Sequence, residues 1–410
     1  MVREAEPGPL QEVTMIGARC PLMVAVMGIG AGLPAQQRTL VVDRLSGPFT
    51  QIADAVAAAR PGDRIEVHPG SYSRFTVSIG VDIDAALGGQ GRSTSSFSVT
   101  NLPANQAVRI QGILYAEYSD VTNCAGPVHL EQVGYLYNSF VAFALTISAS
   151  PQVLLSRCAV GDSRPVYPFA APPSLIVNQS SVLITGCTML GAHGYGTAGL
   201  DAIACNGATI ALSDSVVLGG DGYADSICFG QNTFPHPGGG GITGTGQVTA
   251  VGASSIHGGV GGTNNCGTAS SGAAFSGVTL RLSPGVTVGA GGPSPPQPIA
   301  EPPHLTIPAM LILGFTCVIR VDGCSNATVL LALDLWNGDT VLPGVDLPFM
   351  LTRAAYLQGV GVPDPAGVVT FSQPLPQVPW LLNQFVLVQA AAVDGQGVIR
   401  LSTSGGARLR

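Results

Sequence analysis

One pattern of eight residues recurs along the middle of the chain, and it restricts the fold more than any other feature. It is seen in VLLSRCAV (153–160), VLITGCTM (182–189), IALSDSVV (210–217) and TAVGASSI (249–256), and VGYLYNSF (133–140) fits the same frame. In each copy, apolar residues stand two apart, a small or polar pair follows, and another apolar residue comes two positions later. Recurrence at a period of tens of residues is typical of solenoids, in which each repeat packs on the next.

The sixth position of every copy is Asn, Cys or Ser, which indicates a small side chain stacked at a bend. These positions are Asn138, Cys158, Cys187, Ser215 and Ser254, separated by 20, 29, 28 and 39 residues. A coil of stacked strands allows unequal spacing, because inward residues keep register while corner loops grow. Rungs of such a coil are about 4.8 Å apart, so Cys158 and Cys187 are candidates for a disulfide between neighbouring rungs. An antiparallel sandwich with coincidental similarity is the alternative.

The segment IADAVAAARPGDRIEVHPGSY (52–72) predicts how this coil begins. Its first residues repeat apolar positions at helical spacing, with Thr50 able to cap the start and Pro61 ending the helix. Gly62-Asp63 then turns the chain into a strand in which Ile65 and Val67 face one way. The apolar positions of the helix are Ile52, Ala55, Val56 and Ala59.

With these motifs the chain resembles the secreted bacterial proteins of the right-handed parallel β-helix class, the pectate-lyase-like superfamily. The resemblance is carried by Ile52, Ala55, Val56, Ala59, Gly62, Asp63, Ile65, Val67, Gly70 and Tyr72, followed by the repeats. It implies an all-β right-handed parallel β-helix whose short N-terminal helix caps the open end and hides strand edges. The superfamily includes polysaccharide lyases, glycosidases and esterases as well as members without demonstrated activity, so the fold alone assigns no chemistry.

The distribution of residues along the chain predicts four parts. Residues 1–35 contain Arg19, an apolar run and a small-residue end, which indicates a secretory signal and an extracellular or cell-surface location. The apolar run is too short to cross a bilayer comfortably, so we expect no transmembrane segment in the mature chain. Residues 36–290 form the β-helix, the Pro-rich segment 291–304 a linker, and 305–410 a small β-sandwich.

Charge and cysteine content narrow the function further. The chain has no Lys, a net charge of −7 and no basic run, which excludes lysine-based mechanisms and argues against a nucleic-acid partner. Beyond the signal region it has an even number of cysteines, as disulfides would require. Cys317 and Cys324 are a second candidate pair, because Asp322-Gly323 is suited to a hairpin turn between them.

A lyase of this class would need a base and a group that neutralises a uronate carboxylate. Because Lys is absent, the candidates are Arg109, Arg157 and Arg281, which lie in or beside predicted strands. No cluster of Asp is evident at matching positions in the repeats, so the plain interpretation is exposed strand arginines. The paired carboxylates of a glycosidase, histidine pairs with metal-ligand spacing and a Gly-x-Ser-x-Gly elbow are also missing.

Two further groups of residues suggest binding. Asp201, Asp221 and Asp225 are concentrated acids that could hold calcium through loop oxygens, with solvated turn acids as the alternative. No other cofactor is expected. Aromatic residues in predicted corner loops are suited to stacking on sugar rings, or else pack the loops onto the coil. These aromatic residues are Tyr167, Phe169, Tyr195, Tyr223 and Phe234.

The missing catalytic motifs favour an exported, non-catalytic β-helix protein that acts as a structural, adhesive or glycan-binding module. Its expected partners are polysaccharides or other components of the cell surface. The alternative is an enzyme acting on acidic polysaccharide, most simply a lyase that uses arginine and calcium. A third hypothesis places the function in residues 305–410, as an anchor to a surface or partner.

Overall fold

The computed structural model describes residues 38–86, 92–115, 117–135, 144–161, 165–166, 172–194, 196–223, 235–264, 267–292, 295–308, 310–335, 356–377, 385–403 and 405–409. The predicted signal region therefore lies outside the described residues. Within them, residues 39–298 form mainly parallel sheets, here called the parallel region, and residues 304–409 form mainly antiparallel sheets, here called the C-terminal region. The described part of the chain has no helix with the length and apolarity needed to span a membrane.

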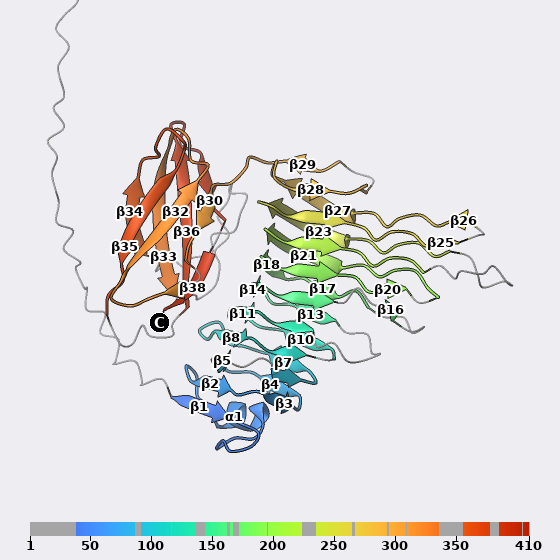
Figure 1. Ribbon diagram of the computed structural model, residues 1–410, viewed down its shortest axis with the longest axis horizontal. Coiled ribbons are helices and arrows are strands. Elements are labelled where there is room, and N and C mark those ends of the chain that lie inside the picture. Colours follow the sequence, from blue (N-terminus) through green and yellow to red (C-terminus); the bar gives the residue numbers. More distant parts are fainter. Residues whose placement is uncertain are drawn as a thin grey trace, which may run out of the picture. The chain divides into compact units, whose positions relative to one another are not determined.

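The largest sheet of the parallel region has sixteen strands in two branches that merge (Figure 1). The first branch contains β1 (Thr39–Val42), β2 (Arg64–Val67), β5 (Asp82–Ala85), β8 (Val108–Gln111), β11 (Val128–Glu131), β14 (Val153–Ser156) and β18 (Ser181–Thr185). The second contains β4 (Phe75–Val77), β7 (Phe97–Thr100), β10 (Ser119–Thr122), β13 (Leu145–Ser148) and β17 (Leu175–Asn178). Both join at β21 (Ile203–Ser213), followed by β23 (Ile242–Val251), β27 (Phe275–Leu282) and β29 (Gln297–Pro298).

A nine-stranded parallel sheet completes the parallel region. It contains β3 (Gly70–Tyr72), β6 (Arg92–Thr94), β9 (Leu114–Tyr115), β12 (Gly134–Tyr135), β15 (Ala159–Gly161), β19 (Thr188–Leu190), β22 (Val216–Leu218), β24 (Ser255–His257) and β28 (Thr287–Val288). The chain visits the second branch, the first branch and this sheet in turn, as in β10, β11 and β12, and each circuit is called a rung below. This order and the parallel pairing are compatible with a parallel β-helix.

Alternation along each strand builds a single core for the parallel region. In the first branch Ile65, Ile83, Ile110 and Leu130 are fully buried and pair in register from strand to strand. Successive side chains of a strand point to opposite faces, so the residues on either side of these positions point away from the core. Parallel stacking thus repeats one apolar position at every rung, which explains the apolar spacing of the sequence repeats.

The register differs from the predicted frame at one repeat. Val128 pairs with Val153 and Gly134 pairs with Ala159, so the rung preceding 153–160 is formed by 128–135 and not by 133–140. Val133 therefore holds the position predicted for Asn138, which lies outside the described residues. The prediction was wrong there because VHLEQVGY carries an apolar residue where the other copies carry a small polar one or cysteine.

The sixth positions of the other copies form a ladder of side-chain hydrogen bonds. The backbone N–H of Cys158 donates to Cys187 Sγ at 3.2 Å, that of Cys187 to Ser215 Oγ at 3.1 Å, and that of Ser215 to Ser254 Oγ at 3.3 Å. Cys158, Cys187 and Ser215 each directly follow a corner residue in the left-handed region, namely Arg157 with φ 52°, Gly186 with φ 59° and Asp214 with φ 50°. The predicted stacking of small side chains at this bend is therefore confirmed for these four residues.

One helix, α1 (Ile52–Ala58), precedes the second strand, and it is the only helix among the described residues. Ile52, Ala55 and Val56 are buried in the core of the parallel region, as their spacing predicts. Its N-cap is Gln51 and makes no side-chain capping hydrogen bond, so the prediction of a Thr50 cap was wrong. Asp63 in the following turn is buried, accepts from the Arg60 N–H at 2.7 Å and pairs with Arg38.

Between the nine-stranded sheet and the second branch, the chain extends outward in six segments that we call the glycine arm. They are residues 190–194, 197–202, 218–223, 235–241, 257–262 and 268–274. Figure 1 shows them running beyond the sheets toward two short pairs, β16 (Pro165–Val166) with β20 (His193–Gly194) and β25 (Thr263–Asn264) with β26 (Gly267–Thr268).

Hydrogen bonds in the glycine arm repeat every three residues. Gly219 and Gly222 donate to the carbonyls of His257 and Val260 at 2.9 and 2.8 Å, while Gly220 donates to Leu200 on another segment at 2.8 Å. Three residues per turn is the period of the polyproline II conformation, which bonds to neighbouring chains rather than to itself. A Cβ at Gly220 would collide with the carbonyl of Ala192, so the high glycine content here allows backbones to pack directly on one another.

The C-terminal region has its own core and two sheets. The smaller sheet contains β30 (His304–Thr306), β32 (Thr316–Asp322) and β35 (Val369–Pro374). The larger contains β31 (Met310–Leu311), β33 (Ala327–Leu335), β34 (Tyr356–Gly361), β36 (Phe385–Asp394), β37 (Ile399–Leu401) and β38 (Gly405–Leu409). Residues 291–304, expected as a linker, include β29, which pairs with β27 and extends the parallel sheet past residue 290.

Candidate functional site

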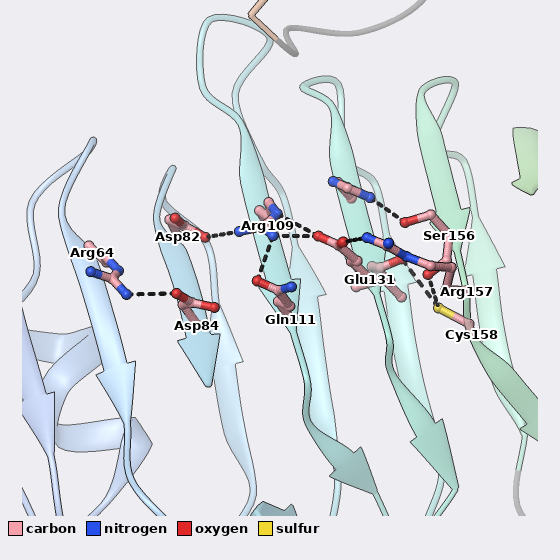
Figure 2. A network of polar contacts seen from close by, with 11 residues as sticks. Arg64, Asp82, Asp84, Arg109, Gln111, Glu131, Ser156, Arg157 and Cys158 are labelled. Atoms are coloured by element: carbon pink, nitrogen blue, oxygen red, sulfur yellow. Dashed lines mark hydrogen bonds and ion pairs between the residues drawn. The ribbon is translucent and has the colours of Figure 1, made fainter. Parts of the chain in front are cut away.

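A network of charged residues crosses the outer face of the first branch (Figure 2). Arg64, Asp82, Arg109 and His129 occupy one paired position on four successive strands, and Asp84, Gln111, Glu131 and Ser156 occupy the position two residues further along β5, β8, β11 and β14. Neighbouring strands in a sheet lie about 4.8 Å apart, which brings these side chains into direct contact. We call this set the charge ladder.

Arg109 lies at the centre of the charge ladder. Its Nε donates to Glu131 Oε2 at 3.1 Å, its Nη1 to Asp82 Oδ1 at 3.1 Å, and its Nη2 to Gln111 Oε1 at 2.6 Å as well as to Glu131. Only 8% of Arg109 is exposed. The interpretation of Arg109 as an exposed strand arginine was therefore wrong, because acids on the two adjacent strands occupy all three nitrogens of its guanidinium group.

Glu131 brings two of the three predicted arginines together. It is 1% exposed, and its two carboxylate oxygens pair separately with Arg109 and Arg157. Arg157 reaches it from the left-handed corner that follows β14, where the neighbouring rungs have Gly186 and Gln132. A non-glycine residue in this conformation costs about 1–2 kcal/mol, which the contact with a buried carboxylate can offset.

The same face of the first branch continues on both sides of these contacts. Arg64 Nη2 pairs with Asp84 Oδ2 at 2.7 Å, and His129 Nε2 lies 2.7 Å from Ser156 Oγ. His129 is fully buried. Each arginine of the charge ladder therefore faces at least one carboxylate on an adjacent strand.

Burial shifts the pKa values within the charge ladder. Burial raises the pKa of Asp82 to about 6, against the lowering effect of the Arg109 charge. Burial would lower the pKa of Arg109, but the carboxylates of Asp82 and Glu131 outweigh it and raise that pKa. Burial, followed by the charges of Arg109 and Arg157, holds the pKa of His129 well below its usual range. His129 is therefore neutral at pH 7 while Arg109 is charged.

Arg281 does not join the other two arginines. It lies on β27 at the same paired position as Arg109 and His129, but Leu154, Leu183, Ala211 and Thr249 occupy that position on the strands between them. At about 4.8 Å per strand, these four strands place Arg281 more than 20 Å from His129. The three candidate arginines thus do not form one site.

The acids predicted for calcium are held by the chain itself where the structure describes them. Asp201 accepts from the Gly240 N–H at 2.6 Å and from Thr243 Oγ1 at 2.7 Å. Asp221 lies 3.2 Å from His193 Nδ1 and accepts from the Val260 N–H at 2.7 Å. Asp225 lies outside the described residues, which contain no cluster of three or more His, Cys, Asp or Glu side chains suited to a metal. Calcium binding therefore stays a prediction.

Of the five aromatic residues predicted to bind a ligand, the structure describes Tyr223. It is partly buried at the outer end of the glycine arm, where its N–H donates to Thr197 O at 3.3 Å and its carbonyl accepts from His236 N–H at 2.9 Å. Tyr167, Phe169, Tyr195 and Phe234 lie outside the described residues.

The structure contains neither predicted disulfide, since Cys158, Cys187, Cys317 and Cys324 are free thiols. Cys158 and Cys187 do lie on adjacent rungs, but Sγ of Cys158 donates to Leu130 O and Sγ of Cys187 to Leu155 O. Both thiols thus bond to the preceding rung. The two cysteines are related by a translation of about 4.8 Å along the stack of rungs. Cys317 is near the start of β32 and Cys324 follows its end, so the strand separates them by roughly 20 Å.

Sequence reasoning missed the acids of the charge ladder. Asp82, Asp84 and Glu131 are on strands whose repeats are shorter and less regular than those downstream, so their alignment with Arg109 was not evident. The usable signal was the common strand frame of VDIDA (81–85), VRIQG (108–112) and VHLEQ (128–132), with polar residues on either side of a central Ile or Leu. Comparisons with protein-family models, with curated proteins and with solved structures give no significant match to this chain.

Proposed function

We propose that this chain is an exported protein with a right-handed parallel β-helix of the pectate-lyase-like type, and that it acts outside the cell without catalysis. Its roles in this proposal are structural, adhesive or glycan-binding, with α1 capping the open end of the coil and residues 305–410 forming a trailing β-sandwich. The burial of Ile52, Ala55 and Val56 in the core of the parallel region supports the capping role. The apolar run within residues 1–35 supports export.

The observation that carries the non-catalytic assignment is that all three guanidinium nitrogens of Arg109 already donate hydrogen bonds to side chains of the protein. A lyase needs a positive group that is free to meet a uronate carboxylate, and a base that substrate can reach. Asp82, Gln111 and Glu131 already engage all three nitrogens of Arg109, and the neighbouring His129 is fully buried. In this proposal the charge ladder holds the strands of the first branch in register.

A lyase assay tests this assignment directly. The full chain is incubated with a panel of acidic polysaccharides with and without calcium, and ultraviolet absorbance from unsaturated uronates is followed. We expect the absorbance to match that of heat-denatured protein. Growth of absorbance that Arg157→Gln abolishes and Arg281→Gln preserves would instead support a lyase centred on the charge ladder.

The glycine arm is where we propose glycan contacts. Tyr223 lies at its outer end beside Thr197 and His236, and the loops that carry Tyr195 and Phe234 begin and end there in the sequence. We expect Tyr223→Ala to weaken retention on immobilised glycans several-fold, because aromatic faces stack on sugar rings. Tyr118→Ala is the matched control, since Tyr118 is exposed but precedes β10 on a different corner. Equal retention of both variants would remove the arm from the proposal.

The C-terminal region is the second candidate for function. Its exposed apolar side chains include Phe315, Val318 and Val362, which are available for contact with a surface or partner. We expect a chain lacking residues 305–410 to lose retention on cells if this region is an anchor. Unchanged retention on cells would mean that the parallel region, and not the C-terminal region, is responsible for binding.

A further inference from the structure

The outer face of the second branch carries a regular array of small polar side chains. On β7, β10, β13, β17, β21 and β23, two outward positions per strand stack in register, through the segments SVT, DVT, TIS, IVN, ACN and TGT. One column holds Ser98, Asp120, Thr146, Ile176, Ala204 and Thr243, and the other holds Thr100, Thr122, Ser148, Asn178, Asn206 and Thr245. We call these twelve residues the polar array.

The positions of the polar array are fixed by backbone pairing. Along the stack, equivalent side chains are about 4.8 Å apart, and along a strand the two outward positions are about 6.6 Å apart. The register is continuous across all six strands of the array, and the first irregularity on β21 falls after Asn206. The result is a lattice with two fixed repeats and no long side chains.

Contacts between neighbouring side chains hold the array in place. Asn178 Nδ2 donates to Ser148 Oγ at 3.1 Å, and Ser98 Oγ donates to Asp120 Oδ1 at 2.7 Å. Thr245 Oγ1 accepts from the Gly207 N–H at 3.0 Å. Side chains that are already ordered lose little conformational entropy when a rigid partner binds. The array is therefore suited to a partner that is itself rigid and periodic.

The chemistry of the array restricts the classes of partner that it could bind. Ten of the twelve residues carry a hydroxyl, amide or carboxyl group, the other two are Ile176 and Ala204, and none is aromatic. Sugar-binding faces use aromatic rings as platforms, which this face lacks. Asp120 is its one charged member, and Ser98 shares it with the exposed Arg74. Small hydroxyls both donate and accept, as water does.

We propose that the polar array binds ice. The two repeats of the array, about 4.8 and 6.6 Å, are close to repeats of the oxygen lattice of hexagonal ice. Its hydroxyl groups, most of them on threonines that also carry a methyl group, can order a layer of water that joins the crystal. Most members are partly exposed, Asn206 and Thr245 are exposed and Ser98 is buried, so most of the face is accessible to solvent. This inference is independent of the glycan contacts proposed for the glycine arm.

Measurement of ice growth tests this proposal on the full chain. The purified protein is placed around a single ice crystal, and the gap between the freezing and melting temperatures is recorded together with crystal shape. The wild-type protein is expected to open a gap and facet the crystal. Ser148→Tyr, which places a large ring at the centre of the array, is expected to reduce the gap to the level of buffer.

Val216→Tyr is the matched control, because Val216 is also an exposed outward residue of a parallel strand but belongs to the nine-stranded sheet. It is expected to keep the wild-type gap, and equal unfolding midpoints of both variants show that each is folded. The proposal is overturned if the wild-type protein opens no gap between freezing and melting temperatures. It is also overturned if the two substitutions reduce that gap equally. Binding of a soluble neutral glycan that Ser148→Tyr abolishes, without any effect on ice, overturns it in favour of a sugar surface.

Discussion

At the scale of single residues, the charge ladder determines how stability depends on its members. Glu131 is 1% exposed and receives both Arg109 and Arg157, so it is the carboxylate that the network depends on most. A buried ion pair adds little net stability compared with apolar packing, but removing one partner leaves a buried charge uncompensated. The charge ladder therefore adds little to the stability of the folded chain, but a substitution that removes one of its charges should lower that stability strongly.

Glu131→Gln is expected to lower the free energy of unfolding by about 3–5 kcal/mol, because two guanidinium groups lose their shared carboxylate. Glu66→Gln is the matched control: Glu66 lies at the equivalent position on β2, three strands earlier, and is more exposed. Its removal should cost no more than about 1 kcal/mol. Urea denaturation of both variants measures the difference, and similar losses would argue against a special role for Glu131.

Asp82 should make stability depend on pH between about 4 and 6. Its pKa of about 6 in the folded chain is above the ordinary value of about 3.9 for Asp. Folding therefore favours the protonated form, and the stabilisation present below pH 4 is lost as pH rises through 6. In Asp82→Asn this change is absent, so the variant should gain up to about 3 kcal/mol relative to wild type between pH 4 and pH 7. Parallel stability profiles of the two proteins would contradict this pKa.

At the scale of elements, the corners that separate the strands are the most restrictive parts. Six residues that directly follow β8, β11, β14, β18, β21 and β23 have positive φ: Gly112, Gln132, Arg157, Gly186, Asp214 and Gly252. A matching set after strands of the second branch includes Asn123 and Ala149. Because glycine alone adopts this conformation without strain, the other residues at these corners carry a local cost unless they make compensating contacts.

Two substitutions to glycine should separate the effect of backbone strain on stability from the effect of the Arg157–Glu131 contact. Ala149→Gly is expected to raise stability by about 1 kcal/mol, because an exposed residue with φ 47° is relieved of strain. Arg157→Gly relieves the same strain but removes a partner of Glu131, so we expect a net loss of stability. Thermal unfolding of the two variants gives the signs, and a gain for both would mean that the Arg157 contact adds nothing.

The glycine arm should not tolerate a methyl group at its centre. A Cβ on Gly259 would meet the carbonyl of Gly220 on an adjacent segment, so Gly259→Ala should destabilise the arm by roughly 1–3 kcal/mol or more. Gly395→Ala is the control, because a Cβ there meets nothing within 4 Å. Limited proteolysis is expected to cleave the first variant faster within the arm, and equal cleavage patterns would show that the close packing is not needed.

At the scale of the whole molecule, the stacking of the strands could be predicted from the sequence, but the arrangement of polar side chains on the outer faces could not. The apolar period, α1 and the bend occupied by Cys158, Cys187, Ser215 and Ser254 follow from local patterns, and the structure shows them. The charge ladder depends on which polar residues of separate rungs become neighbours, and irregular loop lengths hide that register. The polar array left a signal that was overlooked, the recurrence of DVT, TIS and IVN ahead of each corner.

The free thiols give a test of the whole parallel region. Because Cys158 and Cys187 are buried and unoxidised in the structure, iodoacetamide should leave both unmodified in the native protein. Denaturation without a reducing agent should then allow both to be alkylated, as read by mass spectrometry of their peptides. A thiol reductant should leave the melting temperature unchanged. Failure to alkylate either residue in the unreduced, denatured protein would restore the predicted disulfide between them.

The side-chain ladder at the bend has a direction, which bears on how the chain is completed during synthesis. The N–H of Cys158 needs the sulfur of Cys187, the N–H of Cys187 needs the hydroxyl of Ser215, and that of Ser215 needs Ser254. Every donor precedes its acceptor by a full rung, so no bend is satisfied until the following rung has left the ribosome. Folding from the N-terminus therefore leaves the newest of these bends with a backbone N–H that still lacks its acceptor.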